Sequence, residues 1–219
     1  MRRRFPMALC IAGWLAASAG AEIVDRIAVS VGTRVITETD LDREIRITAL
    51  LNNDPLQSRL GNAEKRTTAE RVVDQMLVRS ELEASRYPPP SAADVEAALH
   101  EETSRYGNDA AYRRALAEYG VTEEDLKARL TWQLMLVRFI DVRFRPGIQV
   151  GDDQIRNYFN DKMRAVLLNA HPGQTPSLDD HRAEIEQTLA GQVADQQVEQ
   201  WLKEARRRTH IQYHDEVFK

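Results

Sequence analysis

The sequence predicts a mainly α-helical protein that carries one small β-sheet, and two observations support this fold class. Apolar residues recur at helical spacing through most of the chain between residues 37 and 208. Short segments at the two ends, 22–36 and 209–214, instead alternate apolar and polar residues as strands do. Because a two-stranded sheet is only marginally stable, we expect the segments from both ends to meet in one sheet.

The N-terminal segment reads EIVDRIAVSVGTRVI, and its alternating apolar residues are Ile27, Val29, Val31, Val35 and Ile36. Gly32-Thr33 interrupts the alternation with residues that suit a tight turn, so we predict a short β-hairpin. The C-terminal segment reads THIQYH and places apolar side chains at Ile211 and Tyr213. It is the expected third strand.

The first helices are predicted from residues that cap helix N-termini. These starts are Thr37 or Thr39, Thr67 with Glu70, Ser91 with Asp94, and Asn108. A polar loop, 52–62, separates the first two helices, and Pro88–Pro90 ends the second. Gly120 follows the fourth helix, where a left-handed backbone suits glycine.

A central helix is predicted over residues 122–144, and the rest of the chain is organised around it. Thr122 caps it, and Pro146-Gly147 stops it. One stripe at helical spacing consists of Leu126, Leu130, Leu134 and Val137, while further apolar residues spread around nearly the whole circumference. The dense apolar run, 130–140, is shorter than the ~20 residues of a membrane span. We therefore expect a core helix that is covered on several sides.

Two further helices are expected after the Arg145-Pro146-Gly147 hinge. The first begins near Val150 and carries Ile155, and the sequence LNAHPGQTPS then breaks it. The second, over residues 177–208, is the longest predicted helix of the chain.

The first 21 residues have the pattern of a secretory signal peptide. A basic start, Arg2–Arg4, precedes an apolar stretch, Met7–Ala17, and small residues that favour cleavage after Ala21. A retained membrane anchor is disfavoured by the shortness of that stretch. Cleavage removes Cys10, the single cysteine, and takes the net charge from −4 to −7. An acidic balance argues against nucleic acid as a partner.

The chain shows no pattern of residues that carries catalysis. Its five histidines lack the spacing of a metal site, and no mature cysteine, P-loop, G-x-S-x-G or G-x-G-x-x-G is present. Most acidic pairs fall at helix starts, where the helix dipole favours negative charge. We expect no catalytic residue, no metal and no cofactor, and we expect the protein not to be an enzyme.

An excess of apolar side chains on the central helix and its successor remains to be explained. The simplest explanation is that these residues form core. The alternative is a groove for unfolded polypeptide, in which aromatic and methionine side chains make adaptable contacts. The candidate peptide-binding residues are Trp132, Leu136, Phe139, Tyr158, Phe159 and Met163.

The order of several segments resembles the SurA-type periplasmic chaperones. The segments that carry the resemblance are EIVDRIAVSVGTRVITETDLDREI, AERVVDQMLVRSELEAS, GVTEEDLKARL, VGDDQIRNYFND and the tail EQTLAGQVADQQVEQWLKEARRRTHIQYH. Together they span residues 22–214, although each motif is degenerate. The resemblance implies a helical chaperone core over 22–219, in which a first part, 22–164, is completed by a closing helix and strand, 177–214.

The chain departs from that family at one place. The family carries one or two parvulin-type prolyl isomerase domains before the closing helix, whereas here only about a dozen residues, 166–177, fill the gap. The resemblance then implies an ATP-independent periplasmic chaperone for non-native outer-membrane proteins, without isomerase activity and without stable membrane insertion. An assembly subunit that holds one folded partner is the alternative. The hinge at 145–147 leaves open a homodimer formed by swapping.

Overall fold

A computed structural model describes residues 25–56, 61–170 and 175–219. The expected signal peptide, 1–21, lies outside these ranges. The described chain is mainly helical and has one small antiparallel sheet, which confirms the predicted fold class.

The sheet joins the two ends of the described chain. Strands β1 (Ile27–Val31) and β2 (Arg34–Thr37) form the expected hairpin, and β3 (Ile211–Tyr213) pairs with the other side of β1. The strand order is β2-β1-β3. Gly32 turns the hairpin at φ 60°, a conformation that glycine adopts without strain. The Ser30 hydroxyl also lies 3.1 Å from Nε2 of His214, beyond β3.

Three helices cover the sheet and form the main core with it. They are α1 (Glu38–Asn52), α2 (Asn62–Ala84) and the end of α8 (Leu178–Arg208). Val29 and Ile36 of the sheet, Leu41 of α1 and Val73 of α2 are buried together there. The core thus depends on residues from both ends of the chain.

Most of the predicted helix starts are confirmed, and one is wrong. Thr37, Ser91 and Thr122 each cap a helix and exchange hydrogen bonds with an aspartate three residues on. Thr67 does not start α2, which begins five residues earlier behind Gly61. The Thr67 hydroxyl instead donates to the carbonyl of Ala63, one turn back within the helix.

A pair of short helices packs on the first half of the central helix. α3 (Ala92–Ser104) and α4 (Asp109–Tyr119) share a small core with α5 (Glu123–Arg143). Its buried residues are Leu99, Tyr112, Leu126 and Leu130. Asn108 caps α4, and Gly120 ends it with a left-handed backbone, as the sequence predicted.

The second half of α5 turns a different face to the core than the predicted stripe. Val137 is 58% exposed, whereas Trp132 and Phe139 are buried between α2 and α8. A helix that is apolar on all sides offers no periodicity from which its buried face can be chosen. The neighbouring helices make that choice here, and the stripe through Val137 was therefore wrong at its C-terminal end.

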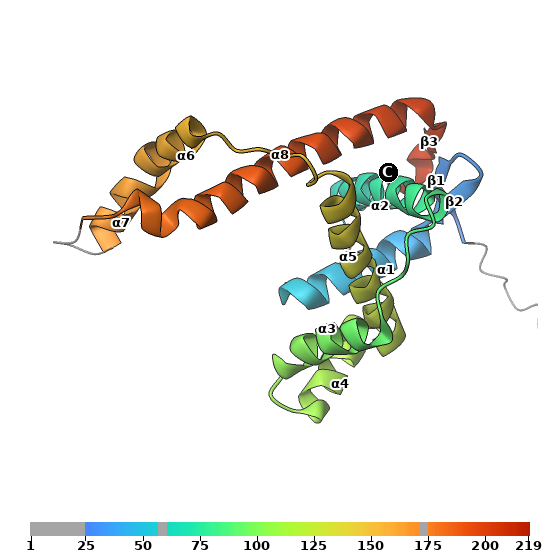
Figure 1. Ribbon diagram of the computed structural model, residues 1–219. Helices are drawn as coiled ribbons and strands as arrows, with labels where there is room; N and C mark the ends of the chain where they lie inside the picture. The colour runs from blue at the N-terminus through green and yellow to red at the C-terminus, as the bar shows by residue number, and fades with distance from the viewer. Residues whose placement is uncertain (1–24, 57–60, 171–174) are drawn as a thin grey trace, which may run out of the picture.

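An arm extends from this body along the first half of α8. α6 (Asp152–Tyr158), a π-helical turn (Phe159–Met163) and α7 (Arg164–Ala170) follow one another, and Ile155 and Phe159 pack on Ile185 of α8. An ion pair of 2.7 Å between Arg182 and Asp152 adds to this contact. Figure 1 shows the α6–α7 segment at the end of α8 that lies far from the sheet.

Candidate peptide-binding site

The structure distributes the six predicted peptide-binding residues over two cores. Trp132 and Phe139 belong to the core between α2, α5 and α8, and their side chains are 3% and 0% exposed. Phe159 is 5% exposed in the core of the arm. The half-buried residues are Leu136, at the first core, and Tyr158 and Met163, at the second. Three of the six are thus core side chains, and the set does not form one surface.

Half-buried apolar side chains surround the first of these cores, and we call five of them the α5–α8 border. They are Met135, Leu136, Ile140, Ile148 and Val198. On the same helix, Val137 and Val142 are still more accessible, and Val142 is 53% exposed. Of the predicted residues, Leu136 alone belongs to this border. Because methionine and aliphatic side chains adapt to varied partners, the border offers a surface for apolar segments.

A second feature, which sequence reasoning missed, is a cleft of about 270 Å³ beside the edge strand β2. We call it the β2 cleft. Strand β2, α1 and α2 line it with the apolar residues Val35, Ile36, Ile47, Val72 and Met76. Its polar lining residues are Asp40, Arg43, Glu44, Gln75 and Arg79. Three consecutive elements of the chain form its walls.

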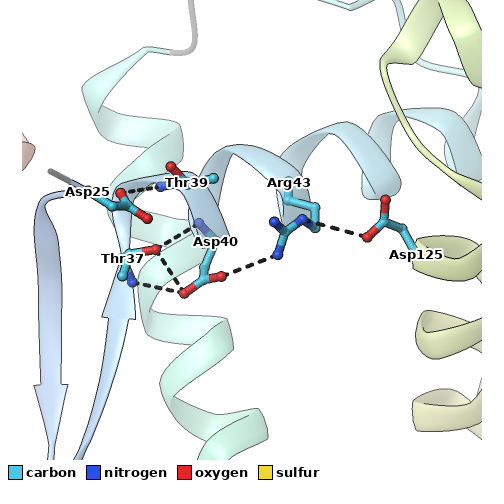
Figure 2. Close-up of polar contacts among 6 residues, drawn as sticks. All are labelled: Asp25, Thr37, Thr39, Asp40, Arg43 and Asp125. Atoms are coloured by element: carbon cyan, nitrogen blue, oxygen red, sulfur yellow. Dashed lines mark hydrogen bonds and ion pairs between the residues drawn. The ribbon is translucent and has the colours of Figure 1, made fainter. Parts of the chain in front are cut away.

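The α1 wall of the β2 cleft is fixed by a chain of polar contacts. Thr37 caps α1, and its backbone N–H donates to the carboxylate of Asp40 over 3.1 Å. Arg43 lies 3.4 Å from Asp40 and 3.6 Å from Asp125 on α5. Figure 2 shows these contacts running from the end of β2 along α1 to α5. They hold the edge strand and the helices in one arrangement.

A more deeply placed ion network lies around Glu44. Its carboxylate accepts a hydrogen bond of 2.7 Å from Arg129 on α5 and another, of 3.3 Å, from Gln75 on α2. Arg71 is a third partner, at 3.7 Å. Burial lowers the pKa of the Arg71 guanidinium, and the negative charge of Glu44 opposes that shift. The network joins α1, α2 and α5 through one carboxylate.

Arg79 differs from the other arginines around the cleft. Its guanidinium lies over the ring of Trp132, 4.3 Å from the ring centre. Burial lowers its pKa even though the residue as a whole is exposed. Within the described ranges no carboxylate lies within 4.0 Å of Arg79, and the negative charges of Glu44 and Glu83 act on it from farther away. It is therefore a partly desolvated cation at the cleft wall, supported by an aromatic ring.

A neighbouring cleft of about 320 Å³ lies under the hairpin turn. The turn at Gly32, α2 and the end of α8 enclose it, and Trp201 and Arg208 are among its lining residues. Met76 lines both clefts. An ion pair between Arg34 and Glu83 ties the hairpin to α2 at this place.

A scan against protein-family models found no matching family, and a search of curated proteins found no matching relative. No cluster of three or more His, Cys, Asp or Glu side chains in the described ranges is placed to hold a metal ion. Across the same ranges, every helix is too short or too polar to cross a membrane.

The β2 cleft had one signal in the sequence. Val35 continues the apolar alternation of the hairpin, but its strand is short and carries the charged Arg34, and both features are common in edge strands. That β2 would be an edge strand depended on β3 pairing with β1 and not with β2. The sequence did not determine this order, so the cleft could not be placed from it.

Proposed function

We propose that this protein is an ATP-independent chaperone of the periplasm, which binds non-native segments of outer-membrane proteins. The observation that carries the proposal is the α5–α8 border, together with the exposed Val137 and Val142. Unfolded β-barrel chains expose alternating apolar and aromatic side chains, which such a surface can cover. Burying ~300 Å² of apolar area contributes several kcal/mol before the costs of association, at ~25 cal/mol per Å². The result is weak and reversible capture, which allows release without ATP.

Two sequence features support the same proposal. The order of the segments across residues 22–214 resembles the SurA-type chaperones, and the first 21 residues have the pattern of an export signal. The sheet formed by both chain ends agrees with the expectation from that resemblance. The chain lacks a domain-sized insert before α8, so the proposal assigns it binding without isomerase activity.

The proposal is tested by light scattering while a denatured outer-membrane porin is diluted into buffer with increasing amounts of the protein. We expect the wild type to suppress aggregation at several-fold excess. The Val137→Ser, Val142→Ser double variant should lose at least half of that effect, since both side chains are exposed and the fold does not need them. A matched control, Val166→Ser with Leu168→Ser, changes two exposed residues of α7 in the same way.

The outcomes separate the function from its surface. Unchanged aggregation with the wild type would overturn the chaperone proposal. Equal suppression by all three proteins would leave the chaperone standing and remove the α5–α8 border as its surface. A protein that holds one folded partner instead would fail with several unrelated unfolded porins and bind a single periplasmic protein at a fixed ratio.

A further inference from the structure

Strand β2 lies at one edge of the sheet in the described part of the chain, and it offers one backbone residue, Val35, for pairing with another chain. β2 is bonded on one side, to β1. The backbone of Ala28 on β1 and that of Gly32, just after β1, both bond toward the β3 side. Backbone groups alternate sides along a strand, so Ser30, which lies between them, also bonds toward β3. Its partner across the hairpin, Val35, therefore directs its N–H and C=O away from β1.

The β2 cleft lies where the side chains of an added strand would go. A residue paired with Val35 would point its side chain to the same face as Val35, which is 48% exposed. Its two neighbours would point to the opposite face, which is the face of the buried Ile36. On this face of the sheet lies the β2 cleft, which the apolar side chains of Val72 and Met76 on α2 help to line. An added strand would thus fill the cleft with alternate side chains.

The charges around the β2 cleft favour a partner that carries a carboxylate. Arg43 is paired with Asp40 and Asp125, and Glu44 is paired with its own arginines. Arg79 is the remaining cation of the lining, and it is already partly desolvated over Trp132. A carboxylate that approaches it gains a charged partner for a smaller loss of hydration than at a fully solvated arginine.

We propose that β2 receives an extended segment of a non-native client as an added strand. The segment pairs with the backbone of Val35, inserts an apolar side chain into the β2 cleft and places an Asp or Glu side chain beside Arg79. This proposal rests on the proposed function, because it describes how the chaperone would recognise the backbone of a client. Strand addition selects extended chains of many sequences, since the main-chain hydrogen bonds are the same for all of them.

The helix cap at the end of β2 keeps the added strand short. The next outward N–H along β2 belongs to Thr37, and it donates to Asp40 within the helix cap. Pairing is thereby confined to the neighbourhood of Val35, and the bound segment gains few main-chain hydrogen bonds. Weak pairing of this kind gives fast release, which suits a carrier that works without ATP.

The experiment measures binding of a fluorescein-labelled peptide to the full protein by fluorescence anisotropy. The peptide alternates valine and threonine around a central phenylalanine and carries a glutamate two residues later, on the same face of an extended chain. Val35→Pro removes the outward N–H but not a β1–β2 hydrogen bond, which an edge strand tolerates. We expect it to weaken binding about tenfold, whereas Val35→Thr, which keeps the N–H, changes binding less than about twofold.

Two further measurements keep the test decisive if Val35→Pro does not fold. A peptide whose central residues are N-methylated should bind the wild type about tenfold more weakly, because it cannot donate to the Val35 carbonyl. Arg79→Gln should weaken the glutamate peptide about tenfold and leave a glutamine version of the peptide nearly unchanged. Equal binding of methylated and unmethylated peptides would overturn the strand-addition proposal.

The result is separable from that of the aggregation assay. If porin aggregation is suppressed but Val35→Pro and N-methylation have no effect, the chaperone stands and this site fails. If the peptide binds in a Val35-dependent manner but aggregation is unchanged, the site stands and the chaperone fails. Sedimentation of the protein alone tests the other occupant, a second copy: a dimer that Val35→Pro dissociates would assign this edge to self-association and overturn the client strand.

Discussion

Phe139 is the residue through which three parts of the chain are held together. It is fully buried, and the rings of Tyr87, Phe144 and Trp201 meet it edge-on at centroid distances of 6.0, 5.5 and 5.6 Å. Tyr87 follows α2, Phe144 ends α5 and Trp201 lies on α8. Edge-on aromatic contacts add to the burial of apolar area. Removing this ring would leave a cavity at the junction of all three segments.

Replacement of Phe139 by alanine should therefore destabilise the protein strongly. We expect Phe139→Ala to lower the free energy of unfolding by about 3–5 kcal/mol, the usual cost of emptying such a site. Val137→Ala, two residues away on an exposed face, should change it by less than about 0.5 kcal/mol. Urea denaturation followed by circular dichroism measures both. Similar losses for the two variants would contradict the burial assigned to them.

At the residue scale, the sequence predicted contacts that are local and failed at contacts that depend on distant segments. Ser91 and Thr122 were identified as caps because their partners, Asp94 and Asp125, lie three residues away in the chain. Phe139 and Val137 could not be told apart, because their burial is decided by α2 and α8. For the same reason the sequence left Phe139 among the candidates for a peptide groove, and the structure buries it fully.

Strand β3 and the residues after it hold the hairpin in place, and we call residues 209–219 the clasp. β3 pairs with β1, Val217 is buried in the same core as Val29, and the guanidinium of Arg66 lies 4.1 Å from the ring centre of Tyr213 and 5.2 Å from that of Phe218. These contacts join the C-terminus to the start of α2 as well as to the sheet. The sheet without β3 would be a bare hairpin, which is marginal by itself.

Truncation after Arg208 should lower the melting temperature by about 10 °C or more, since it removes several kcal/mol of packing and pairing from the main core. A second truncation that removes Lys219 alone, an exposed residue, is the control and should melt like the wild type. Differential scanning calorimetry compares the three proteins. If the two truncated proteins melt together, the clasp contributes nothing and its role in the sheet is refuted.

Elements were predictable where a single pattern defines them. The strands at both ends follow from alternation, and the long closing helix follows from its periodicity. The start of α2 was missed because Gly61 caps it without a side-chain hydrogen bond, so no residue marks it. The β2 cleft was missed because it exists only where β2, α1 and α2 converge.

The whole molecule is divided into a body with a large core and an arm with a small one. The body contains the core around the sheet and the aromatic core between α2, α5 and α8. Among its described residues, the arm has three buried apolar side chains, Ile155, Phe159 and Ile185, and α7 has none. α8 belongs to both parts and connects them (Figure 1). A segment with so little buried area opens more readily than the body.

Hydrogen exchange should therefore distinguish the two ends of one helix. We expect amides of α6, α7 and the first half of α8 to exchange at least tenfold faster than those of α2 and the second half of α8. Mass spectrometry of exchanged and digested protein gives this comparison. Ile185→Ala should accelerate exchange in the arm alone, and uniform protection along α8 would show instead that arm and body open as one unit.

The pairing of β1 with β3 has a consequence for how the chain is made. The side chains of Ser30 on β1 and His214, just after β3, meet although they are 184 positions apart. During synthesis β1 therefore has no β3 to pair with until residues 211–213 have left the ribosome. Until then the apolar face of the hairpin has no β3 to complete it, and closing so long a loop is slow. During its synthesis the protein therefore exposes, for a time, an apolar strand surface of the kind that promotes aggregation in unfolded chains.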